Sequence, residues 1–262
     1  MSTEQPVLRS DAPLDLRLSD AELDATAEHL TSFIADVVDD AGAEGAVLGL
    51  SGGIDSTTVA YLAVEALGAD SVHGLVMPSV VNTEDNMSDA EWVAQELGIT
   101  YDVVEIQPIA EAFFDAFPEA AEDRTAAGNV YVRTRAVMAY FVANHEGKVV
   151  LGTGNRSEAL TGYFTKYGDG AVDCNPIGNL YKQQVRQLAA SLGVPEELVA
   201  KTPSAEMWSG QTDEAEMGLD YDTLDAILAL HVDGPLSAAA TVRALDVTEE
   251  QIDRVVELYE RS

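Results

Sequence analysis

The amino-acid sequence predicts an α/β fold: a doubly wound parallel sheet with helices on both faces, followed by a mainly helical C-terminal part. Two observations lead to this prediction. Short apolar runs of strand length alternate with longer stretches of helical periodicity as far as residue 151, which is typical of βαβ units. Small and polar residues follow three of the predicted strands, as they do where a parallel sheet binds ligands at its carboxyl edge.

The first βαβ unit begins after an N-terminal helix. Ser19 and Glu22 form a capping box, which predicts a helix extending to about Val38. Residues 46–50 are an apolar run of strand length, and residues 55–67 have helical periodicity.

The next elements continue the alternation. Residues 71–77 predict a second strand that ends before Pro78, residues 85–97 a helix, and residues 100–106 a third strand. Gly98 is a natural stop for the helix between them.

A further helix over about residues 129–144 leads to a fourth strand at residues 148–151, which ends before Gly152. After Gly178 the pattern is mostly helical. Because no repeat or linker-like segment interrupts the chain, we expect a mobile N-terminal segment over residues 1–18 and a single domain over residues 19–262.

The composition excludes several kinds of protein. Hydrophobic residues make up 47% of 262 residues, enough for a sizeable core. Cys174 is the single cysteine, so neither an intramolecular disulfide nor a multi-cysteine metal cluster can form. No run reaches ~18 apolar residues, which argues against a membrane span. The N-terminus has no basic start and no apolar signal core, so we expect a cytoplasmic location.

The charge balance is strongly acidic. There are 46 acidic and 14 basic residues, a net charge of −32. The acids are spread along predicted helices, so we interpret them as a carboxylate coat rather than a disordered tail. Such a coat repels itself in ordinary salt and is screened in molar salt, which is typical of a halophilic protein. We expect no nucleic-acid partner, since binding the phosphate backbone of a nucleic acid needs a basic face.

The stretch "LGLSGGIDSTT", residues 48–58, carries the first chemical signal. Glycines after a strand let backbone N–H groups face an anion, and the following helix adds its positive N-terminal end. The stretch is not a Walker A loop, because it lacks the lysine that ends that motif. We therefore interpret it as a cradle for a pyrophosphate that leaves as a unit, with Asp55 available to bind Mg²⁺.

A second block, residues 151–189 and 201–214, concentrates groups suited to ATP-dependent acyl transfer. Glu158 is a second carboxylate able to share Mg²⁺ with Asp55. The other polar side chains that gather in this block are Thr153, Lys166, Asp173, Lys182 and Ser204. Each of these side chains taken alone is typical of a solvated surface residue, whereas their clustering in one block favours a substrate-binding site.

The loop "SGGIDS" resembles the pyrophosphate loop of the N-type ATP pyrophosphatases, which have the adenine nucleotide alpha hydrolase-like fold. The phrases "GTGNRSE", "GYFTKYGDGA" and "PIGNLYK" are similar to those of the NAD synthetase family, and so are "GNVYVRTR" and the spaced residues of 201–218. Together they extend over about residues 46–230.

The resemblance implies specific roles. Asp55 and Lys182 would be catalytic, and Asp55 and Glu158 would hold Mg²⁺. ATP, the co-substrate, would be bound by Gly49, Leu50, Ser51, Gly52, Gly53, Ile54, Asp55, Ser56, Thr153, Lys182 and Ser204. Deamido-NAD would be bound by Arg133, Lys166 and Asp173, near the interface of a homodimer.

Two departures from the family pattern bear on the reaction. The sequence stops at Leu258–Ser262, and the basic His-Lys tail of the family is either lost or omitted from it, which leaves closure over the substrate open. About 45 residues precede the loop, too few for the glutamine-using domain of larger members. We therefore expect ammonia to be the nitrogen donor and Cys174 to be a packing residue.

The expected reaction is the ATP-dependent amidation of deamido-NAD by ammonia, giving NAD, AMP and pyrophosphate through an adenylated carboxylate. Two alternatives fit the loop alone. A GMP-synthetase-like amidotransferase subunit would share the loop but not "GYFTKYGDG", and a non-catalytic nucleotide-binding regulator would not need Glu158, Lys166, Asp173 and Lys182 together.

Overall fold

A parallel sheet forms the centre of the computed structural model, which describes residues 16–79, 84–204 and 211–262. Its strands are β1 (Ala46–Leu50), β2 (Val72–Val76), β3 (Thr100–Val103) and β4 (Val149–Leu151), in the spatial order β3-β2-β1-β4. All neighbouring strands pair in parallel, which confirms the predicted sheet. The third strand ends three residues before the predicted boundary at residue 106.

The strand order creates a switch point. The chain moves outward from β1 through β2 to β3 and then crosses back to place β4 on the other side of β1. In an open parallel sheet the loops at such a point diverge and leave a crevice at the carboxyl ends of the strands. The loops after β1 and β4, which carry the two predicted motifs, therefore meet in one place.

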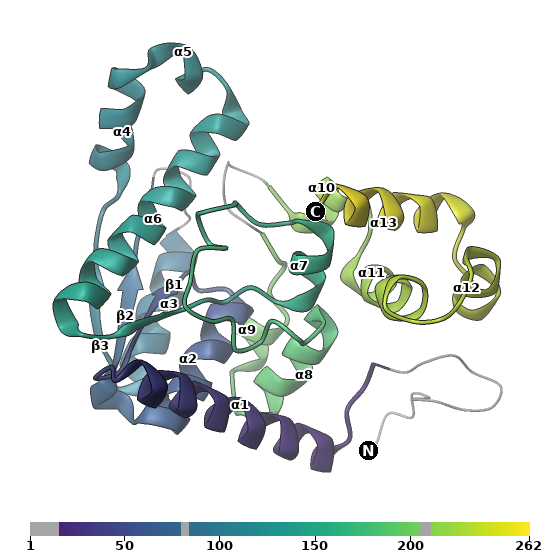
Figure 1. The fold of residues 1–262 in the computed structure, drawn as a ribbon, viewed down its shortest axis with the longest axis horizontal. Coiled ribbons are helices and arrows are strands. Elements are labelled where there is room, and N and C mark those ends of the chain that lie inside the picture. The colour runs from purple at the N-terminus through teal and green to yellow at the C-terminus, as the bar shows by residue number, and fades with distance from the viewer. Residues whose placement is uncertain (1–15, 80–83, 205–210) are drawn as a thin grey trace.

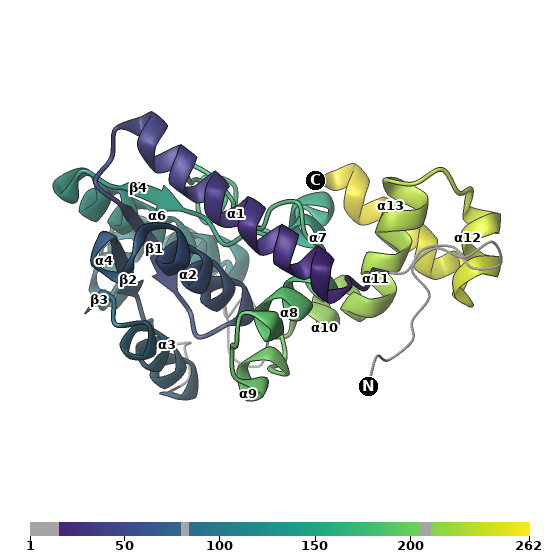
Figure 2. The same ribbon diagram turned by 90° about the horizontal axis from the view of Figure 1, so that it is seen from below.

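Helices cover both faces of the sheet, as predicted (Figures 1 and 2). One face carries α1 (Asp20–Ala41), α2 (Ile54–Leu67), α3 (Glu84–Leu97) and α8 (Lys182–Ser191). The other carries α4 (Gln107–Ala116) and α6 (Arg124–Glu146), joined by α5 (Pro118–Ala121).

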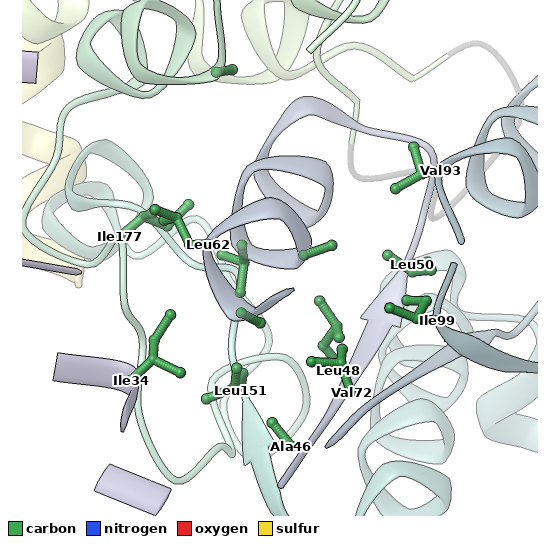
Figure 3. Close-up of a cluster of buried hydrophobic side chains, with 14 of the residues drawn as sticks. Ile34, Ala46, Leu48, Leu50, Leu62, Val72, Val93, Ile99, Leu151 and Ile177 are labelled. Carbon is green, nitrogen blue, oxygen red and sulfur yellow. The ribbon is translucent and has the colours of Figure 1, made fainter. Parts of the chain in front are cut away.

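The two cores follow from alternation along the strands. In β1, Ala46, Leu48 and Leu50 point to the first face and pack with Ile34 and Leu62 of its helices (Figure 3). Val47 points to the other face and belongs to the core under α4 and α6. Because both faces of the strand are buried, it is an almost continuous apolar run, as strands of parallel sheets are.

Helix boundaries differ from the prediction where local signals were overlooked. The first helix continues beyond Val38 to Ala41 and ends at Gly42, whose φ of 61° is the left-handed conformation that glycine tolerates. The sixth helix begins before residue 129, because the Asp123 side chain accepts hydrogen bonds from the Thr125 and Ala126 N–H groups. Helices α4 and α5 were not predicted.

The C-terminal part is mainly helical, as expected, and lies beside the sheet-containing part (Figure 1). Its elements are α7 (Arg156–Thr161), α10 (Asp213–Met217), α11 (Tyr221–Ile227), a π-helical turn (Leu228–Val232), α12 (Ala238–Leu245) and α13 (Glu249–Arg261). The short helix α9 (Glu196–Val199) instead packs Leu198 into the core of the first face. A separate core of Tyr221, Leu224, Ile252 and Val255 holds this part together.

Residues 16–18 lead into α1 and contact both the C-terminal helices and α8. Leu16 is buried in the core of the C-terminal helices, and the Leu18 N–H donates to the Gln187 side chain. The remainder of the segment expected to be mobile, residues 1–15, lies outside the described residues. Among the described helices, none combines the length and apolarity that a membrane crossing requires.

Candidate active site

The glycine loop after β1 is shaped by its own hydroxyl groups. Gly52 has a φ of 72°, a conformation that a residue with a side chain rarely adopts. The Ser51 N–H donates to Ser56 Oγ at 3.3 Å, and the Gly53 N–H donates to Ser51 Oγ at 3.2 Å. Helix α2 begins directly afterwards at Ile54, so its N-terminal N–H groups face the same region. The loop is therefore a preformed turn at the positive end of a helix.

A lysine and two carboxylates meet beside this loop. The Lys182 ammonium group forms an ion pair with Asp55, and its Nζ lies 3.6 Å from Glu158 Oε1. Asp55 is in the first turn of α2, Glu158 in the first turn of α7, and Lys182 is the first residue of α8. The β1/β4 switch point thus assembles residues that are far apart in the sequence.

Asn155 connects the two carboxylates. It caps α7 by accepting a hydrogen bond from the Glu158 N–H at 3.0 Å, and Glu158 Oε2 accepts from the Asn155 N–H at 3.2 Å. The Asn155 amide donates to Asp55 Oδ1 at 3.1 Å. Since Asn155 is fully buried, it fixes the relative positions of α2 and α7.

The charges of the cluster are unbalanced. Burial, followed by repulsion from Asp55, raises the pKa of Glu158 to about 8. Burial opposes the charge of Lys182, but the attraction of Asp55 and Glu158 outweighs it and raises the Lys182 pKa. The raised pKa shows that one lysine does not offset two carboxylate charges, so Glu158 ionises fully at neutral pH only with a further positive charge beside it. The oxygen donors and this deficit of positive charge fit a divalent cation such as Mg²⁺.

The Tyr221 ring packs against the Lys182 ammonium group. The Lys182 ammonium group lies 5.1 Å from the centre of the Tyr221 ring, and the Tyr221 hydroxyl donates to Asp213 Oδ2 at 2.9 Å. The Lys182 N–H donates to Ser157 Oγ at 3.0 Å. Only 2% of Lys182 is exposed, so its side chain is held in one position rather than free in solvent.

These groups line one large cavity of about 660 Å³. Every residue that the resemblance assigns to ATP lines it: Gly49, Leu50, Ser51, Gly52, Gly53, Ile54, Asp55, Ser56, Thr153, Lys182 and Ser204. Glu158 lines it as well. Ser204 is held by donating from its hydroxyl to the Gln211 carbonyl at 2.8 Å. A cavity of this size accommodates a nucleotide.

The residues expected to contact the second substrate lie outside this lining. Arg133 Nε donates to the Lys166 carbonyl at 3.2 Å, and both residues are exposed. Asp173 accepts from the Val150 N–H at 2.7 Å and from the Tyr140 hydroxyl at 3.1 Å. All three residues therefore lie close to α6, and the structure does not bring them to the Lys182 cluster within one chain.

Cys174 lies next to Asp173 and is half-buried against the core. Burial and the neighbouring Asp173 carboxylate raise the pKa of its thiol to about 11. A thiol with so high a pKa is a poor nucleophile at neutral pH.

Sequence reasoning overlooked several residues of the cavity. Asn155 follows the recognised Gly-Thr-Gly turn, and its capping box with Glu158 could have been read from their spacing. Asp213 and Lys201 lie in the block 201–214 that the sequence pattern indicated, but no role was predicted for either residue. No sequence pattern indicated Tyr221, because its position against the Lys182 ammonium group arises only from tertiary packing.

Comparisons with known proteins agree with this geometry. The NAD synthase family model matches residues 26–262. A relative from Halobacterium salinarum, named NH(3)-dependent NAD(+) synthetase, is 63% identical over 95% of this chain and 92% of its own length. A relative of the same name from Hyperthermus butylicus is 46% identical over 94% of this chain and 89% of its own length.

Solved structures resemble the whole chain. An NMN synthetase from Francisella tularensis has a TM-score of 0.81 and 36% identity, covering 94% of this chain and 95% of its own. An NH3-dependent NAD synthetase from Campylobacter jejuni has a TM-score of 0.76 and 30% identity, covering 92% and 94%.

Proposed function

This chain belongs to the NAD synthase family and is a ligase, and we propose that it amidates deamido-NAD with ammonia at the expense of ATP. The observation that carries the proposal is the convergence of Lys182, Asp55 and Glu158 on the glycine loop at the β1/β4 switch point. The match over residues 26–262 leaves no support for the GMP-synthetase-like alternative or for a non-catalytic regulator.

The first step is adenylation. A carboxylate oxygen of deamido-NAD attacks the α-phosphorus of ATP and forms a phosphorus–oxygen bond. The bond between the α-phosphorus and its bridging oxygen breaks, and pyrophosphate leaves with that oxygen. The loop of Ser51, Gly52 and Gly53 suits the departing group, because hydroxyl donors and a helix N-terminus stabilise developing negative charge.

Lys182 stabilises the same step. Its ammonium group is buried and fixed, so it can neutralise phosphate charge without reorganising. Lys182 pairs with Asp55, and the Asn155 amide donates to Asp55, so these contacts fix Lys182 relative to α2 and α7. Asp55 and Glu158 are also the residues that would hold Mg²⁺, which when bound would neutralise charge on the phosphate oxygens.

The second step is the displacement of AMP. The nitrogen of ammonia attacks the activated carbonyl carbon, the carbon–oxygen bond to AMP breaks, and the nitrogen loses a proton to give the amide. Ammonia must be in its neutral form, because ammonium has no free electron pair.

A homodimer would complete the site for the second substrate. Val137 and Phe141 on α6 are each 70% exposed, and with Arg133 they form an i, i+4, i+8 row on one side of the helix. Exposed apolar rows of this kind favour protein interfaces. Because Arg133 lies in this row, we propose that deamido-NAD binds where two chains meet.

A mononucleotide substrate is a second candidate. The solved structure with 36% identity is that of an NMN synthetase, so this fold also serves a smaller product. The corresponding substrate here would be nicotinic acid mononucleotide. The names of the curated relatives favour the dinucleotide.

One assay tests both candidates. AMP production by the purified chain should require both ammonium and a deamidated substrate, and deamido-NAD should give a higher kcat/KM than nicotinic acid mononucleotide. The reverse preference would favour the second candidate, and AMP production without either compound would refute both.

A further inference from the structure

Lys201 joins the glycine loop to a neighbouring helix. Its Nζ donates to the Gly52 carbonyl at 3.1 Å and forms an ion pair with Asp89 of α3. Lys201 also lines the cavity, as do the three residues that follow it, Thr202, Pro203 and Ser204. One side chain therefore connects three parts of the cavity wall: the loop, α3 and residues 201–204.

Gly52, whose carbonyl accepts the hydrogen bond from Lys201, has a backbone conformation that other residues rarely adopt. Gly52 has a φ of 72°, and its carbonyl belongs to the peptide group whose N–H is that of Gly53. The carbonyl and N–H of a trans peptide point in opposite directions. Lys201 holds the carbonyl while Ser51 Oγ accepts from the N–H, so the peptide is held from both sides.

The ion pair contributes little to the stability of the fold. The side chains of Lys201 and Asp89 are 26% and 34% exposed, and partly exposed pairs are weakened by solvent screening. Removing Lys201 should therefore leave a folded protein. What it removes is the anchor of the Gly52–Gly53 peptide, and the effect should appear in the binding of the group that the loop cradles.

We propose that Lys201 is a positioning residue that holds the glycine loop in the conformation that binds the polyphosphate of ATP. Asp89 takes part by holding the Lys201 ammonium group against the Gly52 carbonyl. This inference rests on the proposed function only in the identity of the nucleotide, and a binding measurement tests it without turnover.

The experiment measures binding of α,β-methylene ATP with Mg²⁺, and of AMP, by calorimetry at constant salt. The variants are Lys201→Met, Lys201→Arg and Asp89→Asn. The matched control is Lys148→Met, because Lys148 is also paired with a carboxylate, Glu146 at 2.8 Å, but is not part of the cavity lining. It makes the same change of net charge as Lys201→Met.

We expect Lys201→Met to weaken α,β-methylene ATP binding about tenfold while AMP binding changes less than about twofold. Lys201→Arg should recover most of the affinity, since a guanidinium can bridge the same two acceptors. The control should match the wild type. Equal affinities in Lys201→Met and Lys148→Met, or equal losses for both ligands, would overturn the proposal.

Asp89→Asn distinguishes positioning from direct contact with phosphate. If Lys201 acts through the loop, loss of its anchor should weaken α,β-methylene ATP binding. If Lys201 instead binds phosphate directly, releasing it from Asp89 and removing a negative charge should leave binding unchanged or strengthen it, and the positioning role would be wrong. An enzyme that binds the nucleotide in this way but does not amidate deamido-NAD would refute the proposed function alone.

Discussion

The Lys182 ammonium group forms an ion pair with the Asp55 carboxylate, although 127 positions separate the two residues. The pair joins the starts of α8 and α2 beside the glycine loop. It also places a fixed positive charge where the proposed reaction develops negative charge on phosphate oxygens. The proposed mechanism depends on this contact.

Lys182→Met should lower the rate of AMP formation by ~10²–10³-fold, because it removes a preorganised charge that acts mainly in the transition state. The KM for deamido-NAD should change much less. Steady-state kinetics with each substrate varied in turn measure the split. Lys148→Met is the control for charge, and a Lys182→Met enzyme as active as that control would contradict the role.

Glu158→Gln should slow pyrophosphate release by ~10²-fold, since it keeps the shape of the side chain but removes the charge of one proposed Mg²⁺ ligand. Raising Mg²⁺ should recover part of the rate. Pyrophosphate release across a Mg²⁺ titration is the measurement. A near wild-type rate at low Mg²⁺ would show that Glu158 serves only to cap α7 with Asn155.

The folded dimer should require molar KCl. The net charge of −32 opposes compaction and association, and molar salt reduces the screening distance to about 3 Å. We expect the unfolding temperature to rise by several degrees between low and molar KCl, and sedimentation to show a dimer at high salt. Phe141→Glu should dissociate the dimer at high salt without changing the unfolding of the monomer. Salt-independent unfolding would count against this account.

Ammonium should support turnover and glutamine alone should not. At a fixed total ammonium concentration below saturation, the rate should rise as the pH increases from 7 to 8. Each pH unit raises free ammonia about tenfold while ammonium remains the main form. Initial rates at several pH values, with deamido-NAD saturating, measure this dependence. Efficient turnover of glutamine by the purified chain would refute the prediction.

Much of the sheet was predictable from the sequence, because strands buried on both faces have distinct apolar runs. Residues 46–50 were predicted with the boundaries that the structure has. The unpredicted helix α4 begins with Gln107 and Pro108 immediately after residues 104–106, a mostly apolar stretch that was assigned to the third strand but lies outside it. Short apolar runs do not distinguish a strand from the start of a helix.

The convergence of the glycine loop and Glu158 was also predictable, because both follow strands whose ends must meet at the switch point. The part played by Tyr221, Asp213 and Lys201 was not predictable, since they come from C-terminal segments whose packing against the sheet has no local signal. The roles of Arg133, Lys166 and Asp173 also remain predictions, and these residues are not among those that line the cavity of their own chain.

Transfer of oxygen from deamido-NAD to AMP tests the adenylation step most directly. The carboxylate of deamido-NAD is labelled with ¹⁸O, and AMP, pyrophosphate and NAD are analysed by mass spectrometry after turnover with ammonium. Attack of the carboxylate on the α-phosphorus predicts one ¹⁸O atom in AMP and none in pyrophosphate. AMP without the label, or label in pyrophosphate, would contradict the proposed mechanism.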